Sequence, residues 1–328
     1  MSHQFESGFF VNQGAWHGLG TVLNNPPSTA VAIAEAGLNW HIIEQPIYTQ
    51  SEQGLSPVST HKSLVRSSDY QLLGIVSQSY KPLQNEQAFS WFDFLLHDGD
   101  VSLESAGSLK DGKRIWILAR INQDPADIIK GDTVEPYLLL SNSHDGSTAI
   151  WIQFTPIRVV CQNTLSYALS RRKEDLNIGR ASCSIASTRG TRATASRAFR
   201  IRHQGNIEQK LSNAKTALDF ARQRFEIATD EYKAMASVQL NQQDLDLYLS
   251  LVLDTDTPQS TRAYPQIIAN FESGRGNKGQ TLWDAYNGVT EWLDHQRGGS
   301  DSSRLESAWF GNSAKTRSQA HQSALEFV

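Results

Sequence analysis

Cysteine and long apolar runs are both scarce in this sequence of 328 residues. Only Cys161 and Cys183 are present, too few for a disulfide framework or a cysteine-based zinc site, so we expect a reducing compartment. No run of about 18 apolar residues occurs, and the N-terminal MSHQFESG lacks the basic and apolar regions of a signal peptide. These absences predict a cytoplasmic protein that makes no contact with a membrane.

The common enzyme signatures are absent as well. The sequence has no phosphate-cradling GxxxxGK[ST], no dinucleotide GxGxxG after a strand, no HExxH and no GxSxG. We therefore assign no cofactor and no metal, and the sequence favours a binding protein over an enzyme.

The most informative stretch runs from residue 136 to residue 169 and begins with two apolar runs separated by Asp145-Gly146. Asp-Gly between such runs is a strong hairpin signal, because the turn that matches strand twist needs positive φ. We predict antiparallel strands from about Tyr137 to Ser141 and from about Thr148 to Thr155. Pro156 is expected to end the pairing, because proline has no N–H to donate.

The flanking segments extend this hairpin into a larger unit. Upstream, Arg114 to Ile121 alternates small or branched apolar residues with other side chains and predicts a third strand. Downstream, the spacing of Val160, Leu165, Ala168 and Leu169 suits a helix, with Asn163 or Gln162 near its start. The sequence thus predicts an α+β fold: an antiparallel β-sheet with a β-β-β-α core unit, followed by an α-helical C-terminal third.

We expect three regions along the chain. Residues 1–170 form the sheet and helix core, and residues 171–203 form a basic flexible segment that is poor in large apolar residues. Residues 204–328 form a helical region, in which apolar residues from Ile207 to Met235 follow a heptad spacing. Such a seam needs a partner surface, which is either the sheet of the same chain or a neighbouring subunit.

The charge of the chain is unevenly distributed. The net charge of −4 alone argues against a nucleic-acid-binding protein. From residue 158 to residue 203, however, there are ten Lys or Arg and two acidic residues, a net charge of +8, which leaves −12 for the remainder. A basic patch on an acidic protein is typical of a polyanion site. The alternative is a solvated loop whose arginines have no specific role.

This basic segment is the predicted nucleic-acid interface. Its side chains would neutralise phosphates, so the affinity should fall as salt rises. Trp116 and Trp151, on predicted strands, are candidate stacking faces for bases. No helix-turn-helix or zinc finger is evident, so we expect no base-specific readout. The predicted nucleic-acid-binding residues are Arg158, Arg171, Arg172, Lys173, Arg189, Arg192, Arg197, Arg200, Arg202, His203 and Trp151.

A few residues leave a catalytic or metal-binding role open. His144 and Asp145 are adjacent and can ligate a metal, although neighbouring strand residues face opposite sides and the turn already explains Asp145. Cys161, near the start of the predicted helix, is either a nucleophile or a small buried residue. An enzyme would need His17, His144, Asp145 and His203 to converge on one site.

A set of short motifs is spread over nearly the whole chain: Trp16-His-Gly-Leu-Gly, Ala36-Gly-Leu-Asn-Trp40, Ala106-Gly-Ser-Leu, Asn142-Ser-His-Asp-Gly-Ser147, Arg158-Val-Val-Cys-Gln-Asn-Thr-Leu165, Ile201-Arg-His203 and the helix from Trp283 to His295. In these motifs the chain resembles the phage/plasmid-like protein family of unknown function. The resemblance implies a mobile-element context and supplies no activity. The family-motif residues without an assigned role are Trp16, His17, His144, Asp145 and Asn163.

A second resemblance is architectural. Three strands, a helix and an adjoining basic segment are similar to the core of the single-strand annealing proteins, the Rad and Redβ/RecT-like recombination mediators. This resemblance implies a single-stranded DNA-binding protein that promotes annealing and forms a homo-oligomer, as a ring or a filament. The alternatives are a metal-dependent enzyme of mobile-element nucleic-acid metabolism, and a structural or host-interaction protein.

Overall fold

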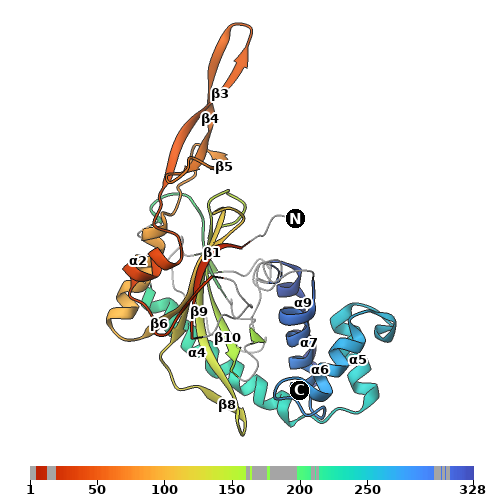
Figure 1. The fold of residues 1–328 in the computed structure, drawn as a ribbon. Coiled ribbons are helices and arrows are strands. Elements are labelled where there is room, and N and C mark those ends of the chain that lie inside the picture. Colours follow the sequence, from red (N-terminus) through yellow and green to blue (C-terminus); the bar gives the residue numbers. More distant parts are fainter. Residues whose placement is uncertain are drawn as a thin grey trace, which may run out of the picture.

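The computed structural model shows a large sheet, a projecting β-ribbon and a group of helices (Figure 1). It describes residues 5–12, 20–159, 163–164, 176–177, 198–207, 211, 214–298, 304, 307 and 311–328. The sheets are largely antiparallel and the helices are concentrated in the C-terminal part, so the predicted mixture of sheet and helix in this order is confirmed. No helix within these ranges is long and apolar enough to span a membrane.

The main sheet collects strands from the first two thirds of the chain. Its strands are β1 (Phe5–Val11), β2 (Thr21–Leu23), β6 (Val101–Leu109), β7 (Arg114–Ile121), β8 (Ala126–Ile129), β9 (Asp132–Ser143), β10 (Ile150–Arg158), β11 (Asn163–Thr164), β12 (Leu176–Asn177) and β13 (Ala198–Ile201). They lie in the order β12-β13-β10-β9-β7-β6-β1-β2, with β11 beside β10 and β8 beside β9. The pairs β1–β2 and β12–β13 are parallel, and the other described pairs are antiparallel.

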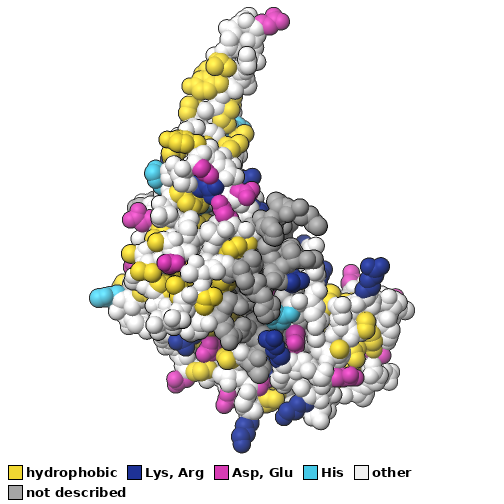
Figure 2. All heavy atoms as spheres, in the orientation of Figure 1, with side chains coloured by type: hydrophobic (Ala, Val, Ile, Leu, Met, Phe, Trp, Pro, Cys, Tyr) yellow, Lys and Arg dark blue, Asp and Glu magenta, His cyan; other side chains and the backbone are white. Residues whose placement is uncertain are grey.

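A second sheet forms a ribbon that projects from the body of the molecule (Figure 1). Strands β3 (Ile42–Ser51) and β4 (Gly54–Arg66) pair over most of their length, whereas β5 (Leu72–Ser77) pairs only with the part of β4 nearest the body. Figure 2 shows hydrophobic side chains along this ribbon, and Tyr48 and Leu55 are 53% and 69% exposed. The outer half of the ribbon is therefore two-stranded and carries apolar side chains in solvent.

The predicted hairpin is confirmed as β9 and β10, which pair from Trp151 opposite Ser141 to Arg158 opposite Val134. The turn between them is wider than the two-residue turn that Asp-Gly favours. Ser143 closes it, because its Oγ donates to the carbonyl of Thr148 and accepts from the Thr148 N–H. Gly146 still supplies a positive φ of 76°.

The expectation that Pro156 ends the pairing is wrong. Pro156 lies within β10, directly opposite Pro136 of β9. On the other side of β10, the described pairing with β13 stops at Gln153 and the pairing with β11 begins at Ile157. Proline is tolerated here because no described neighbouring strand requires its missing N–H.

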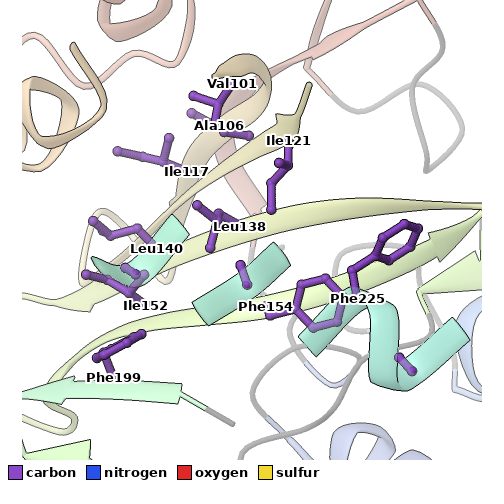
Figure 3. Close-up of a cluster of buried hydrophobic side chains, with 14 of the residues drawn as sticks. Val101, Ala106, Ile117, Ile121, Leu138, Leu140, Ile152, Phe154, Phe199 and Phe225 are labelled. Carbon is purple, nitrogen blue, oxygen red and sulfur yellow. The ribbon is translucent and has the colours of Figure 1, made fainter. Parts of the chain in front are cut away.

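The main core lies between one face of the large sheet and helix α4 (Ala214–Ser237). Figure 3 shows side chains from β6, β7, β9 and β10 gathered with those of β13 and α4. Phe154 of β10 meets Phe225 of α4 with ring centroids 6.3 Å apart. Each fully buried side chain of this size contributes about 1.5–3 kcal/mol, so the contact between sheet and α4 stabilises the body of the molecule.

The heptad-spaced residues predicted from the sequence belong to this core. Leu218, Phe225 and Tyr232 of α4 are buried, as are Ile207 and Leu211 before it. Of the two partners that the sequence left open, the structure shows the sheet of the same chain. This face of α4 is therefore not free to contact a neighbouring subunit.

The opposite face of the sheet carries a second buried cluster made of Phe10, Leu109, Trp116, Leu118, Tyr137 and Leu139. Trp116 is completely buried there, and its Nε1 donates to Ser105 Oγ at 3.1 Å. The expectation that Trp116 offers a stacking face is therefore wrong, because both faces of strand β7 are covered.

The helix predicted from about residue 160 to residue 169 lies almost wholly outside the described residues. Asn163 and Thr164, which are described, form β11 and pair with Arg158 and Ile157 of β10. A residue whose backbone pairs with a strand is not part of a helix. The predicted β-β-β-α unit is corrected to this extent, and the helix that covers the sheet is α4.

The remaining helices lie at two places. Helices α1 (Thr29–Glu35) and α2 (Asn85–His97) pack together beside the base of the ribbon. Helices α5 (Gln242–Leu253), α6 (Tyr264–Ser273), α7 (Leu282–Glu291) and α9 (Asn312–Ala324) form the C-terminal group, in which α7 contacts α4. Helix α7 begins at a capping box between Thr281 and Asp284.

Candidate nucleic-acid interface

Trp151 and Arg200 form an aromatic and cationic pair near one edge of the main sheet. They are cross-strand partners in the register of β10 and β13, and Arg200 Cζ lies 5.5 Å from the centroid of the Trp151 ring. Both side chains are partly exposed. Arg200 Nε is shielded from solvent and has no hydrogen-bond partner in the part of the chain that the structure describes. The pair combines an aromatic ring with a guanidinium that has an unused donor.

The chain of the basic segment returns to the sheet beside this pair. It leaves β10 after Arg158, seven residues beyond Trp151, pairs with the sheet again at β11 and β12, and enters β13 at Ala198, two residues before Arg200. Arg202 directly follows β13 and is exposed. The other predicted basic residues lie outside the described residues: Arg171, Arg172, Lys173, Arg189, Arg192 and Arg197.

Arg158 has a different role from the one that the sequence suggested. Its side chain is fully buried, and its Nε and Nη2 donate to the two carboxylate oxygens of Asp132 at 2.6 and 2.5 Å. Its Nη1 donates to Asn277 Oδ1 at 2.8 Å, and its guanidinium lies 5.4 Å from the Trp283 ring. Trp283 Nε1 donates to the same carboxylate at 2.7 Å. Arg158 is thus withdrawn from the predicted interface and joins the sheet to the C-terminal helices.

His203 is also withdrawn from the surface. Its ring stacks on Tyr80 with centroids 4.4 Å apart, and its Nδ1 donates to the carbonyl of Lys81 at 3.0 Å. Burial lowers the pKa of His203 to about 4, although the bond to Lys81 opposes the shift. A histidine that is neutral at pH 7 adds no charge to a phosphate site.

His144 is fully buried and hydrogen-bonded on both ring nitrogens. Asn85 Nδ2 donates to the carbonyls of Leu38 and Trp40, so Asn85 Oδ1 accepts from His144 Nε2 at 3.0 Å. His144 Nδ1 then accepts from Asn142 Nδ2 at 3.4 Å. Burial, followed by the charge of nearby His203, lowers the pKa of His144 to about 3. His144 is therefore a neutral residue. Through Asn85 of α2, it connects the motif at residues 142–147 with the motif at residues 36–40.

The predicted convergence of histidines on a metal is not seen in the described part of the chain. Asp145 Oδ1 accepts from the Ser147 N–H at 2.8 Å and so belongs to the turn. Within the described ranges no group of three or more His, Cys, Asp or Glu is arranged to hold a metal ion. The motif residues Trp16 and His17, and also Cys161, lie outside the described residues.

A family model described as a domain of unknown function, DUF932, matches residues 72–179 and 180–325. These two ranges cover well over half of the chain. The chain belongs to the DUF932 family. No curated protein and no solved structure matches it. The resemblance seen in the sequence motifs is confirmed to the extent that the chain belongs to a family of unknown function.

The boundaries of the DUF932 match fall at informative places. The match begins at Leu72, the first residue of β5, so β3 and β4 of the ribbon precede it. The break between its two parts, after residue 179, falls inside the basic segment. The DUF932 match therefore contains β10 and β13, which carry Trp151 and Arg200.

A groove with a volume of about 890 Å³ lies between α1 and α2 of this DUF932 protein. Trp40, Phe89 and Asp93 are among the residues that line it, and Asn85 connects its wall to His144. None of the predicted nucleic-acid-binding residues that the structure describes lines this groove. The groove is thus separate from Trp151 and Arg200 on β10 and β13.

Sequence reasoning missed two groups of polar residues in the DUF932 fold. Asp132 and Trp283, the partners of Arg158, are distant in the sequence, and no local pattern connects them. Glu104, Arg120 and Glu135 lie near one another on the sheet. A signal for this second group was present, because Arg120 shares the strand face of the apolar residues Trp116 and Leu118.

Proposed function

We propose that this protein binds single-stranded DNA near the sheet edge, at β10 and β13 beside the edge strand β12, and promotes its annealing. The observation that carries the proposal is the Trp151–Arg200 pair, which lies two residues from Ala198, where the chain of the basic segment returns to the sheet in β13. Proteins that bind single strands combine a cationic surface with aromatic side chains on which bases stack. Both components occur together at this edge.

The chemistry of the pair suits a single strand better than a duplex. A base stacked on an aromatic side chain contributes about 1–3 kcal/mol and must first be unstacked from its neighbours. The Arg200 side chain is partly exposed, so its guanidinium can contact a phosphate oxygen. Arg202 and the basic residues of the segment would add further phosphate contacts and release counterions.

The annealing activity, the mobile-element context and the homo-oligomer extend this proposal from the two resemblances found in the sequence. An antiparallel sheet with an adjoining basic segment supports the likeness to single-strand annealing proteins. Because the heptad face of α4 is buried in its own chain, a ring or filament would have to use another surface.

Equilibrium binding of a fluorescent single-stranded oligonucleotide tests the proposal. We expect Trp151→Ala and Arg200→Ala each to weaken binding by about fivefold or more, since each removes a stacking or phosphate contact. Arg262→Ala is the matched control, because Arg262 is an exposed arginine in the C-terminal helical region. An intact protein that does not bind at low salt, or variants that bind like the control, would contradict the proposal. The rate at which complementary oligonucleotides pair then tests annealing.

A further inference from the structure

A second polar cluster lies on the same face of the main sheet as Trp151. Arg120 of β7 pairs with Tyr137 of β9, which in turn pairs with Thr155 of β10. Side chains of paired residues in an antiparallel sheet point to the same face, so these three form a row across the strands. Thr155 is an even number of residues from Trp151 and lies about 13 Å further along β10.

Two glutamates flank the guanidinium of Arg120. Glu104 Oε1 lies 3.5 Å from Arg120 Nε, and Glu135 Oε1 lies 3.7 Å from Arg120 Nη1. Hydrogen bonds between such charged groups are about 2.7–2.9 Å long, so these two contacts are ion pairs that are longer than a hydrogen bond. Tyr137 donates its hydroxyl hydrogen to Glu135 Oε2 at 3.0 Å, which fixes that carboxylate.

Two polar atoms of the row are shielded and unsatisfied. Arg120 Nε has no hydrogen-bond partner in the described part of the chain, and neither has Thr155 Oγ1, in a residue that is only 2% exposed. Buried polar groups in proteins are normally hydrogen-bonded. Two orphaned groups in one row indicate a place for a partner that the chain does not supply.

Glu104 is able both to donate and to accept a hydrogen bond at neutral pH. Burial raises the pKa of Glu104 to about 7, opposed by the charge of Arg120 and reinforced by that of Glu135. Glu104 lies at a β-bulge, because the register of β6 with β7 shifts between Leu103 and Ser105. Bulges re-aim side chains and are common beside binding sites.

The charges of the cluster restrict what it can bind. A phosphate would face two carboxyl groups, and a metal ion would face the guanidinium of Arg120. A neutral group that carries hydrogen-bond acceptors and donors side by side fits better, since it can accept a hydrogen bond from Arg120 and donate one to Glu135. The edge of a nucleobase has this arrangement. The side chains of Glu104, Glu135 and Arg120 are 18%, 23% and 37% exposed, so an unstacked base can reach the exposed parts of these three. Thr155 is only 2% exposed, so a base would reach its Oγ1 only after neighbouring side chains move.

We propose that Glu104, Arg120 and Glu135, together with Thr155, bind the hydrogen-bonding edge of one base of the single strand. This inference rests on the proposed function. It also departs from the expectation, drawn from the missing DNA-binding motifs, that no base is read.

The test compares the affinities of labelled oligo-dT, oligo-dC and oligo-dA for the full-length protein and its variants. We expect the intact protein to prefer one of them by about fivefold or more, the usual size of a base contact. Glu104→Gln and Thr155→Val should reduce this preference to about twofold or less while keeping the affinity for the weakest of the three. Glu52→Gln makes the same charge change at an exposed position of the ribbon and should leave the preference unchanged.

Measurement at two pH values separates a binding role of Glu104 from a structural one. Because Glu104 titrates near neutrality, the preference should change between about pH 6 and about pH 8 in the intact protein and not in Glu104→Gln. Equal affinity for the three oligonucleotides, or a preference that both variants retain, would overturn the base site and leave single-strand binding standing. Failure of the intact protein to bind any of them at low salt would overturn both proposals.

Discussion

Removing Arg158 should destabilise the fold rather than weaken DNA binding directly. In Arg158→Ala the carboxylate of Asp132 stays buried and loses the two guanidinium donors at 2.6 and 2.5 Å. It keeps only the Trp283 Nε1 donor among the side-chain contacts described. Breaking a buried ion pair by removing one partner costs about 3–5 kcal/mol, because the remaining charge is uncompensated. We therefore expect the free energy of unfolding to fall by about this amount.

Urea denaturation followed by tryptophan fluorescence measures the effect, with Arg222→Ala as the matched control. Arg222 pairs with Asp100 at 2.6 Å, but its side chain is 34% exposed, so its loss should cost only about 0.2–1 kcal/mol. A loss in Arg158→Ala no larger than in the control would refute this account of the buried pair. Normal stability combined with lost DNA binding would return Arg158 to the interface.

The core and the buried histidines give further predictions. Trp116→Ala should lose about 3–5 kcal/mol of stability in thermal unfolding, whereas Trp151→Ala should lose much less because Trp151 is partly exposed; equal losses would contradict the difference in burial between the two tryptophans. Phe225→Ala should destabilise the chain by a similar about 3–5 kcal/mol without changing the mass measured by light scattering, and a change of mass would show that α4 contacts another subunit. His144 and His203 have pKa values of about 3 and about 4 in the folded state, below the unfolded value of about 6.5. As the pH falls below 6.5 the unfolded chain gains protons that the folded chain does not. The free energy of unfolding should therefore decline toward pH 4 by up to about 1.4 kcal/mol per pH unit for each histidine. His144→Gln should remove the contribution of one histidine to this pH dependence. An unchanged pH dependence in the variant would contradict a buried neutral His144.

Local sequence patterns were sufficient for elements whose signal is local. The alternation of β7 and the apolar runs around Asp145-Gly146 predicted strands that the structure confirms. The heptad spacing before Met235 predicted a buried helix face, and the structure shows that the chain buries it against its own sheet. The heptad spacing alone could not decide between the sheet of the same chain and a neighbouring subunit, because an apolar helix face indicates only that some surface covers it.

Predictions failed where a residue's environment depends on distant parts of the chain. Pro156 is accepted inside β10 because the neighbouring strands leave a gap beside it. In the sequence, Arg158 looks like one more basic residue of the segment. Its burial depends on Asp132 and Trp283, which are distant in the sequence and contact each other and Arg158 only in the fold. Trp116 and Trp151 have the same strand setting in the sequence, and only the sheet order makes one central and the other close to an edge.

The salt dependence of single-strand binding tests the central proposal most directly. Each phosphate contact to a single strand contributes about 0.7 to the slope of log affinity against log salt. Replacing Arg189, Arg192, Arg197, Arg200 and Arg202 by alanine should therefore weaken binding and reduce this slope by up to about 3.5. A slope that is the same in this variant and in the intact protein would contradict the assignment of DNA binding to the basic segment.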